Sequence, residues 1–346
     1  MPHNDRFMKP LFSMMFAVAL WPVVMGSLVA GDADYALSHL PPVPRSKPIK
    51  LDSPMVLKEF APGVQVAIGQ AVGLTGTLLM DQGPVDGLEV LACLATGKTH
   101  ESLVRLDAAS GQLVKAAFLA ALGLKDGMPA SEGSGIPGRG VPVRVEIEWE
   151  PLDQPGTWFS IDVSCMIRDR ITDQSYPSLP FIFTGSRFLL IDETAPDGRP
   201  VKQERFMLDN TKSVIDIVDE PDALFASPSP GANFDKHFEV NSGISPPANS
   251  KVRLLFTKTT LPLTLSMDAG GVLLAAGQPL NDQALQQVLA KHYGQGATPN
   301  HRAVGVMVEA ATAREHDIAA RSRILAAAAV AQVWVVPIFS LTDKAP

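Results

Sequence analysis

The chain has 346 residues, of which 46% are hydrophobic and 19% charged, which is enough for sizeable buried cores and about two domains. Proline (29) and glycine (27) are frequent, so an ordered protein with many turns is expected and a coiled coil is excluded. The net charge of −7 argues against nucleic acid as a partner, because phosphate binding requires concentrated Lys and Arg.

Residues 1–30 form a separate segment, in which Arg6 and Lys9 precede an uncharged apolar stretch at 11–30. A basic start, an apolar middle and a small-residue exit are typical of a secretory signal peptide. The stretch is also long enough to span a bilayer, so an uncleaved membrane anchor is the alternative. Both alternatives predict a periplasmic or exported protein. The Pro-rich segment at 31–55 is expected to be a semi-rigid linker.

From 56 to 258 the sequence predicts a β-rich domain, because short apolar runs are separated by Gly, Pro and Asp clusters. The clearest run is VPVRVEIEW at 141–149, which alternates with the period of a half-buried antiparallel strand. FIFTGSRFLLI, at 181–191, is expected to be another strand, with a bulge at Gly185.

One segment of this domain, QLVKAAFLAALG at 112–123, departs from the strand pattern. It is rich in helix formers, is apolar nearly all round and ends at Gly123, so it predicts one buried helix packed on the sheet. The Gly- and Pro-rich loop at 123–140 follows, and long loops of this kind are usually mobile or functional.

The segment GKTHES, at 97–102, contains several chemically active side chains and follows the apolar run LEVLACLA in the sequence. If the segment is extended, His100 and Ser102 share a face and come within reach of each other, as a base and a nucleophile must. No G-x-S-x-G elbow or oxyanion-hole signature accompanies them. The alternative is that His100 and Glu101 hydrogen-bond backbone groups and fasten a corner. No catalytic residue is assigned, and the candidate ligand-binding residues are Lys98, His100, Glu101 and Ser102.

Cys93 and Cys165 are the only cysteines of the chain. In an exported protein two cysteines can form a disulfide. The alternative is that both are small buried side chains in the core.

FDKHFEV would place Asp235, His237 and Glu239 on one face of a strand. These residue types are permissible ligands for zinc or a similar ion, although no H-E-x-x-H motif supports a metal site.

From 259 to 340 the order of predicted elements is ββαβαβ, which indicates a small two-layer α/β sandwich and makes the whole chain α+β. The first helix, NDQALQQVLAKHYG, is expected to be capped by Asn281 or Asp282. The second lies at 312–331, with Thr312 as its cap. Its charged residues are expected on a solvated face: Arg314, His316, Asp317, Arg321 and Arg323.

The stretch from LEVLACLATGKTHESLVRLDA to LVKAAFLAALGLKDG resembles the YdjY-type domain, an envelope-associated family with a G-K-x-H-E-S signature before an Ala- and Leu-rich helix. VRVEIEW, FIFTGSRF and SVIDIVDEP continue the resemblance, which covers about 60–257. It implies no established activity. Some relatives are labelled iron–sulfur proteins, but a cubane cluster needs about four thiolates, so no cofactor is expected here. The signature positions are Gly97, Lys98, His100, Glu101 and Ser102.

Residues 261–337 are similar to the periplasmic domain of ExbD and TolR proteins, through LTLSMDAGGVLLAAGQPL, AVGVMVEAAT and AQVWVVPI. The resemblance implies a domain that dimerises and contacts the cell wall or partner proteins. Those relatives carry a transmembrane Asp for proton coupling. Residues 11–30 contain no acidic residue, so a motor role is not implied.

The sequence therefore predicts an exported, membrane-associated envelope protein of the scaffold or partner-docking type, without enzymatic activity. Its expected partner is an envelope protein or a cell-wall component, and a homodimer through the C-terminal domain is a further expectation. The alternative is an enzyme or small-ligand binder with its site at the GKTHES motif.

Overall fold

The computed structural model describes the chain from 47 to 341 with short interruptions. The expected leader at 1–30 lies outside the described residues, as does most of the linker after it. No helix in the described part is long and apolar enough to cross a membrane. The fold is mixed α+β and rich in strands, as predicted. The described residues are 47–84, 86–131, 135–170, 173–176, 179–229, 232, 238–294, 305–310, 314–333 and 335–341.

Eight strands of the N-terminal domain close into a barrel-like ring. In ring order these are β7 (Val141–Trp149), β11 (Phe181–Phe183), β15 (Phe225–Ala226), β14 (Ser213–Asp216), β5 (Val90–Cys93), β6 (Ser102–Leu106), β4 (Ala71–Leu78) and β17 (Lys251–Lys258), which returns to β7. A closed ring leaves its strands no open edge, so its apolar side chains can form one continuous core.

Shorter strands extend this ring. Beyond β4 and β7 they are β3 (Val64–Ala67), β2 (Lys58–Ala61), β8 (Trp158–Asp162) and β1 (Ile49–Leu51). A 3-10 turn, η1 (Val163–Met166), leads into a separate small sheet of β9 (Ile167–Asp169), β10 (Gln174–Ser175) and β16 (Phe238–Val240).

The predicted helix is α2, which runs over Gly111–Leu122 and ends at Gly123, whose left-handed φ of 55° suits glycine. Its inner face packs into the barrel core. The outer residues Leu113 and Leu119 are 48% and 39% exposed, so the predicted buried helix is buried on its inner face alone. The Phe118 ring contacts three aromatic rings of the barrel, at centroid distances of 4.8 to 6.0 Å: Phe183, Phe225 and Phe256.

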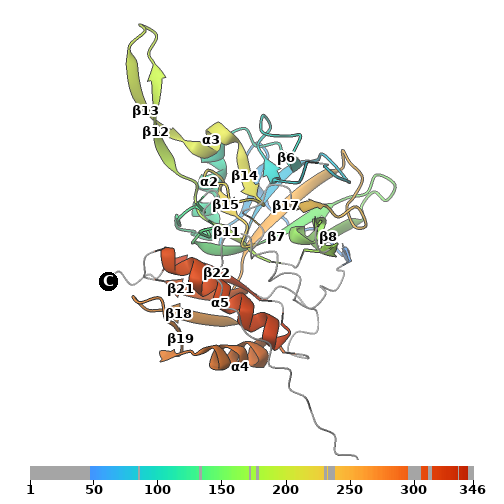
Figure 1. Ribbon diagram of the computed structural model, residues 1–346. Coiled ribbons are helices and arrows are strands. Elements are labelled where there is room, and N and C mark those ends of the chain that lie inside the picture. The colour runs from blue at the N-terminus through green and yellow to red at the C-terminus, as the bar shows by residue number, and fades with distance from the viewer. Residues whose placement is uncertain are drawn as a thin grey trace, which may run out of the picture.

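FIFTGSRFLLI is two strands and not one, so the prediction of a bulged strand is wrong. β11 ends at Phe183, and left-handed backbone at Gly185 (φ 90°) and Ser186 (φ 57°) turns the chain out of the barrel. The next strand, β12 (Phe188–Thr194), pairs with β13 (Pro200–Phe206) in a sheet of two strands. This hairpin, residues 188–206, projects from the body and is called the arm (Figure 1). Helix α3 (Met207–Thr211) follows it.

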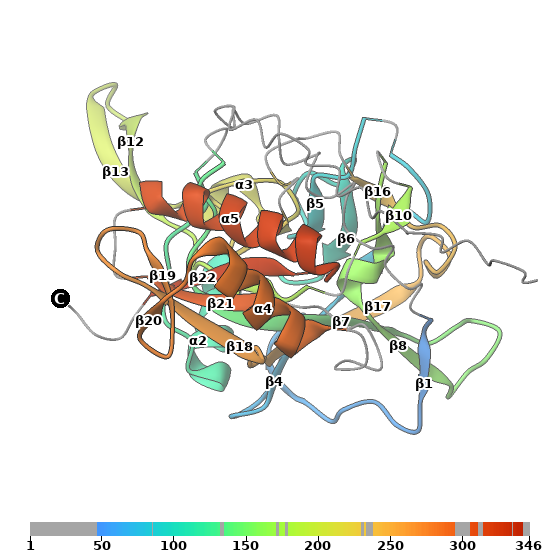
Figure 2. The ribbon, with the colours of Figure 1, turned by 60° about the horizontal axis from the view of Figure 1, so that its bottom comes forward.

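The C-terminal domain has a five-stranded sheet in the order β20–β19–β18–β21–β22, with both helices on one face (Figure 2). Its elements are β18 (Leu263–Met267), β19 (Leu273–Ala275), β20 (Gln278–Pro279), α4 (Asp282–Tyr293), β21 (Gly305–Ala310), α5 (Glu315–Ala331) and β22 (Val336–Leu341). The two-residue β20 was not predicted. Asn281 caps α4, accepting from the Ala284 N–H at 2.8 Å, whereas Thr312 lies outside the described residues.

The Gly-rich loop at 123–140 lies against the C-terminal domain. Arg139 donates to both carboxylate oxygens of Asp317, at 2.8 and 2.7 Å, and the two residues are 2% and 0% exposed. The Gly140 N–H also donates to the Phe339 carbonyl at 3.0 Å. The loop therefore joins the two domains.

Two arginines of the C-terminal domain complete this junction. Arg314 donates to the carbonyls of Pro129 and Pro137, and Arg321 donates to those of Pro228 and Ser229. The prediction of a solvated face on the last helix is wrong, because Asp317 and Arg321 are buried between the domains. Arg323, by contrast, pairs with Asp282 on the exposed side, at 2.9 Å.

Candidate functional site

The GKTHES segment is a tight turn between β5 and β6, and not the extended strand considered from the sequence. The Ser102 hydroxyl donates to the Lys98 carbonyl at 2.6 Å, and the Lys98 ammonium lies 3.0 Å from a Glu101 carboxylate oxygen. Gly97 passes so close to the strand that an added Cβ would stand 2.7 Å from the Cβ of Cys93. The corner is therefore fastened by Ser102, by the ion pair and by a position that excludes side chains.

His100 contributes little to this fastening. Its side chain is 81% exposed, and its Nε2 lies 3.6 Å from Glu101. Ser102 is fully buried, with its hydroxyl proton directed to Lys98, so His100 and Ser102 do not form a base–nucleophile pair. Of the two residues expected to fasten the corner, Glu101 does so through its ion pair with Lys98, and the exposed imidazole adds a contact with Glu101. Ligand binding by the motif remains a prediction.

A buried acid, Asp216 on β14, lies beneath the corner and was missed from the sequence. It is 1% exposed, and its carboxylate makes no hydrogen bond of normal geometry within the described part of the chain, although the Ser213 hydroxyl lies near it. Burial raises the pKa of Asp216 well above its usual range and Glu220 adds to this, while Lys98 and the nearby Ser213 hydroxyl oppose it. The only sequence signal was an Asp flanked by Ile residues in SVIDIV, where burial is expected.

Lys98 is the cation of this acidic cluster. Its ammonium lies 4.0 Å from Glu89 as well as 3.0 Å from Glu101, and these two ion pairs help to raise the pKa of Lys98, while burial opposes them. A lysine with a raised pKa keeps its proton and is a poor nucleophile. The two ion pairs therefore hold the Lys98 ammonium against the turn.

Cys93 and Cys165 are both buried thiols and are not joined by a disulfide. Burial raises the pKa of the Cys93 thiol, and the neighbouring Ser102 hydroxyl partly opposes this. A neutral, buried thiol is chemically inert, so Cys93 behaves as a small core residue, the second of the two alternatives.

The predicted metal ligands Asp235 and His237 lie outside the described residues. The third, Glu239 on β16, accepts from Arg168 Nε at 2.7 Å and lies 3.5 Å from Arg170. Within the described ranges, no group of His, Cys, Asp and Glu side chains has the arrangement of a metal site.

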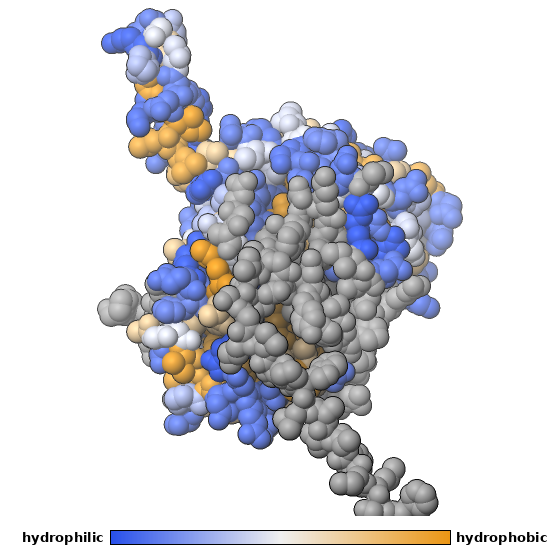
Figure 3. All heavy atoms as spheres, in the orientation of Figure 1, coloured by the Kyte–Doolittle hydropathy of each residue, from blue (hydrophilic) through white to orange (hydrophobic). Residues whose placement is uncertain are grey.

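The arm is the second feature that the sequence did not reveal. It leaves large apolar side chains in solvent, and Figure 3 shows them gathered between the charged tip and the body. Such a patch on a projecting element is typical of an interaction surface. The exposed fractions are 52% for Phe188, 37% for Leu189, 67% for Leu190 and 41% for Val201.

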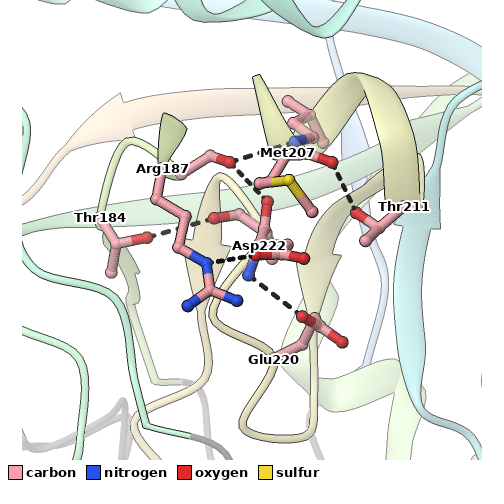
Figure 4. A network of polar contacts seen from close by, with 9 residues as sticks. Thr184, Arg187, Met207, Thr211, Glu220 and Asp222 are labelled. Carbon is pink, nitrogen blue, oxygen red and sulfur yellow. Dashed lines mark hydrogen bonds and ion pairs between the residues drawn. The ribbon is translucent and has the colours of Figure 1, made fainter. Parts of the chain in front are cut away.

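The root of the arm is held by a polar network (Figure 4). Arg187 donates to the Asp222 carboxylate at 2.5 Å, and the Ser186 hydroxyl donates to the Asp222 carbonyl at 2.6 Å. At the start of α3, the Met207 N–H donates to the Arg187 carbonyl at 2.9 Å. Lys115 of α2 adds cation–π contacts with the Phe188 and Phe206 rings, 5.8 and 5.3 Å from their centroids. The arm is thus anchored at its root, where Phe206 is buried, and among the described residues its two strands pair with no third strand.

Comparison with protein-family models, with curated proteins and with solved structures finds no match for this chain. The YdjY-type and ExbD/TolR-type resemblances therefore rest on the motifs quoted above.

Proposed function

We propose that this chain is an exported envelope protein that docks a partner through the arm. The arm carries the proposal, because within the described part of the chain β12 and β13 pair only with each other while Phe188, Leu190 and Val201 stay exposed. An isolated two-stranded hairpin is marginally stable in water, so a partner that covers its apolar side chains would stabilise it.

The remainder of the molecule suits a rigid support for such an arm. The Arg139–Asp317 ion pair and the arginine–carbonyl contacts hold the C-terminal domain against the barrel. In this proposal the C-terminal domain is a ββαβαβ sandwich of the ExbD/TolR type, and the leader at 1–30 directs or anchors the chain outside the cytoplasm. An envelope protein or cell-wall component is the expected class of partner.

A deletion of the arm tests this function. Residues 189–205 can be replaced by a short glycine turn without cutting a barrel strand, and this keeps Phe188 and the buried Phe206, which pair with each other at the root of the arm. We expect the shortened protein to fold with native circular dichroism but to migrate as a smaller species on native gels of gently solubilised envelopes. An unchanged complex would count against docking by the arm.

The second candidate function is small-ligand binding at GKTHES, and the buried, weakly hydrogen-bonded carboxyl of Asp216 is the observation that favours it. A polar ligand that donated hydrogen bonds to Asp216 would relieve that buried group. Thermal-shift screening of amines and polyols against wild type and Asp216→Asn tests this candidate. A ligand that stabilises both proteins equally does not bind through Asp216.

A further inference from the structure

We propose that the partner of the arm is the arm of a second copy of this chain, with β12 pairing antiparallel to β12 around a two-fold axis at Leu190. This inference rests on the proposed function, since it names the partner that the arm docks. It joins two hairpins into one four-stranded sheet, and sheets of three or more strands are independently stable where a lone hairpin is not.

The two edges of the arm differ in their ability to pair. β13 begins with Pro200, which lacks an N–H, and continues with Lys202, Glu204 and Arg205. Proline and charged side chains are the usual protection of a strand edge against pairing. β12 instead opens with four consecutive apolar residues, FLLI, so it is the edge that pairs.

A two-fold axis at Leu190 makes this edge self-complementary. Leu190 then faces its own copy, and Leu189 faces Ile191 of the second copy, so the centre of the pairing is apolar. Arg187 faces Glu193 of the second copy, which places opposite charges at both ends. These two side chains are 40% and 31% exposed, so each can reach across while keeping its contact within its own chain.

The charges of the arm disfavour the other occupants. Asp197 and Arg199 stand exposed at the tip, and the apolar residues lie nearer the body, whereas insertion into a lipid surface needs an apolar tip. The ion pairs Arg205–Glu193 and Lys202–Asp192 neutralise charge within the hairpin. The arm therefore lacks the concentrated charge that would attract a strongly charged partner.

Cysteine crosslinking tests the register. Across a pair of antiparallel strands, opposed Cα atoms lie about 4.5 to 5.5 Å apart, within the range that a disulfide spans, so Leu190→Cys on the axis should crosslink to itself. Glu204 is the matched control, because it pairs directly with Leu190 inside the hairpin. In the four-stranded sheet it would stand three strand spacings, about 14 Å, from its copy, too far to bond.

Under mild oxidation of the purified full chain, we expect Leu190→Cys to form a covalent dimer while Glu204→Cys and the wild type, whose cysteines are buried, stay monomeric on denaturing gels. Light scattering should show a reversible wild-type dimer that Leu190→Asp converts to monomer with unchanged circular dichroism. Dimerisation of Glu204→Cys as readily as Leu190→Cys, or no dimer from either variant, would overturn the proposal. Sedimentation of the wild type with lipid vesicles, lost in Leu190→Asp, would also overturn it.

A photo-crosslinking residue at 190, used in intact envelopes, separates failure of this inference from failure of the proposed function. An adduct of twice the chain mass supports self-pairing. An adduct with another protein alone leaves docking by the arm standing and overturns self-pairing. Absence of any adduct overturns both.

Discussion

Arg139 and Asp317, which are 178 positions apart in the chain, form a buried ion pair with two hydrogen bonds of 2.8 and 2.7 Å. One residue comes from the Gly-rich loop of the barrel domain and the other from helix α5 of the C-terminal domain. The pair fixes a loop that its composition had marked as mobile or functional. These contacts place the loop at the junction of the two domains.

Asp317→Ala should destabilise the protein strongly, because it leaves the Arg139 guanidinium buried without its carboxylate. Loss of one partner of a buried pair costs about 3 to 5 kcal/mol in the free energy of unfolding. Arg323→Ala is the control, since its pair with Asp282 is exposed and contributes at most about 1 kcal/mol. Urea unfolding measures both, and equal losses would show that the buried pair does not hold the domains together.

Asp216→Asn should remove part of the pH dependence of stability. Because the folded state raises the pKa of Asp216, it binds this proton more tightly than the unfolded chain, and wild-type stability falls as pH rises from the ordinary aspartate pKa, about 3.9, through the folded pKa. The amide cannot ionise, so the variant should gain stability relative to wild type as pH rises. Denaturant unfolding of both proteins across this pH range measures the difference in their free energies of unfolding. A difference that does not change with pH would refute the raised pKa of Asp216.

Gly97→Ala should destabilise the GKTHES turn, since the new methyl group would stand 2.7 Å from the Cβ of Cys93 and 2.9 Å from that of Lys212. Overpacking of this kind costs about 1 to 3 kcal/mol. Gly243→Ala is the matched control, because the nearest atom to its Cβ, Asn241 Oδ1, is 3.6 Å away. The thermal unfolding midpoint of Gly97→Ala should lie clearly below that of Gly243→Ala. A Gly97→Ala midpoint equal to that of the wild type would mean that the turn can shift to make room for the methyl group.

Ser102→Ala and His100→Ala compare what the buried hydroxyl and the exposed imidazole of the GKTHES motif each contribute to stability. Removal of the Ser102 hydroxyl breaks its bond to the Lys98 carbonyl and should cost about 1 kcal/mol of stability. His100 is 81% exposed, so its replacement should change stability by less than about 0.5 kcal/mol. The opposite order in chemical denaturation would restore the imidazole as the fastener of the corner.

The sequence predicted what depends on local periodicity. The alternation of apolar and polar residues at 141–149 predicted β7. Gly123 marked the C-terminal end of α2, and Asn281 marked the start of α4. These features are set by neighbouring residues, so they can be recognised without knowledge of the tertiary fold.

Features that depend on distant contacts were not predicted. Asp317 and Arg321 have the composition of a solvated helix face, and only the docking of α5 on the barrel buries them. FIFTGSRFLLI has continuous strand propensity, and the left-handed backbone at Ser186 that ends the strand is supported by Asp222, which is 36 residues away. Tertiary packing decides both outcomes, and a single sequence carries no signal for it.

Photo-crosslinking in intact envelopes tests docking by the arm most directly. The comparison is between a photo-reactive residue at Leu190, 67% exposed on β12, and one at Leu152, which is 98% exposed on a loop of the barrel domain. If the arm is the docking element, position 190 gives a discrete adduct and position 152 gives none. Equal labelling at both positions, or an adduct only at 152, would contradict it.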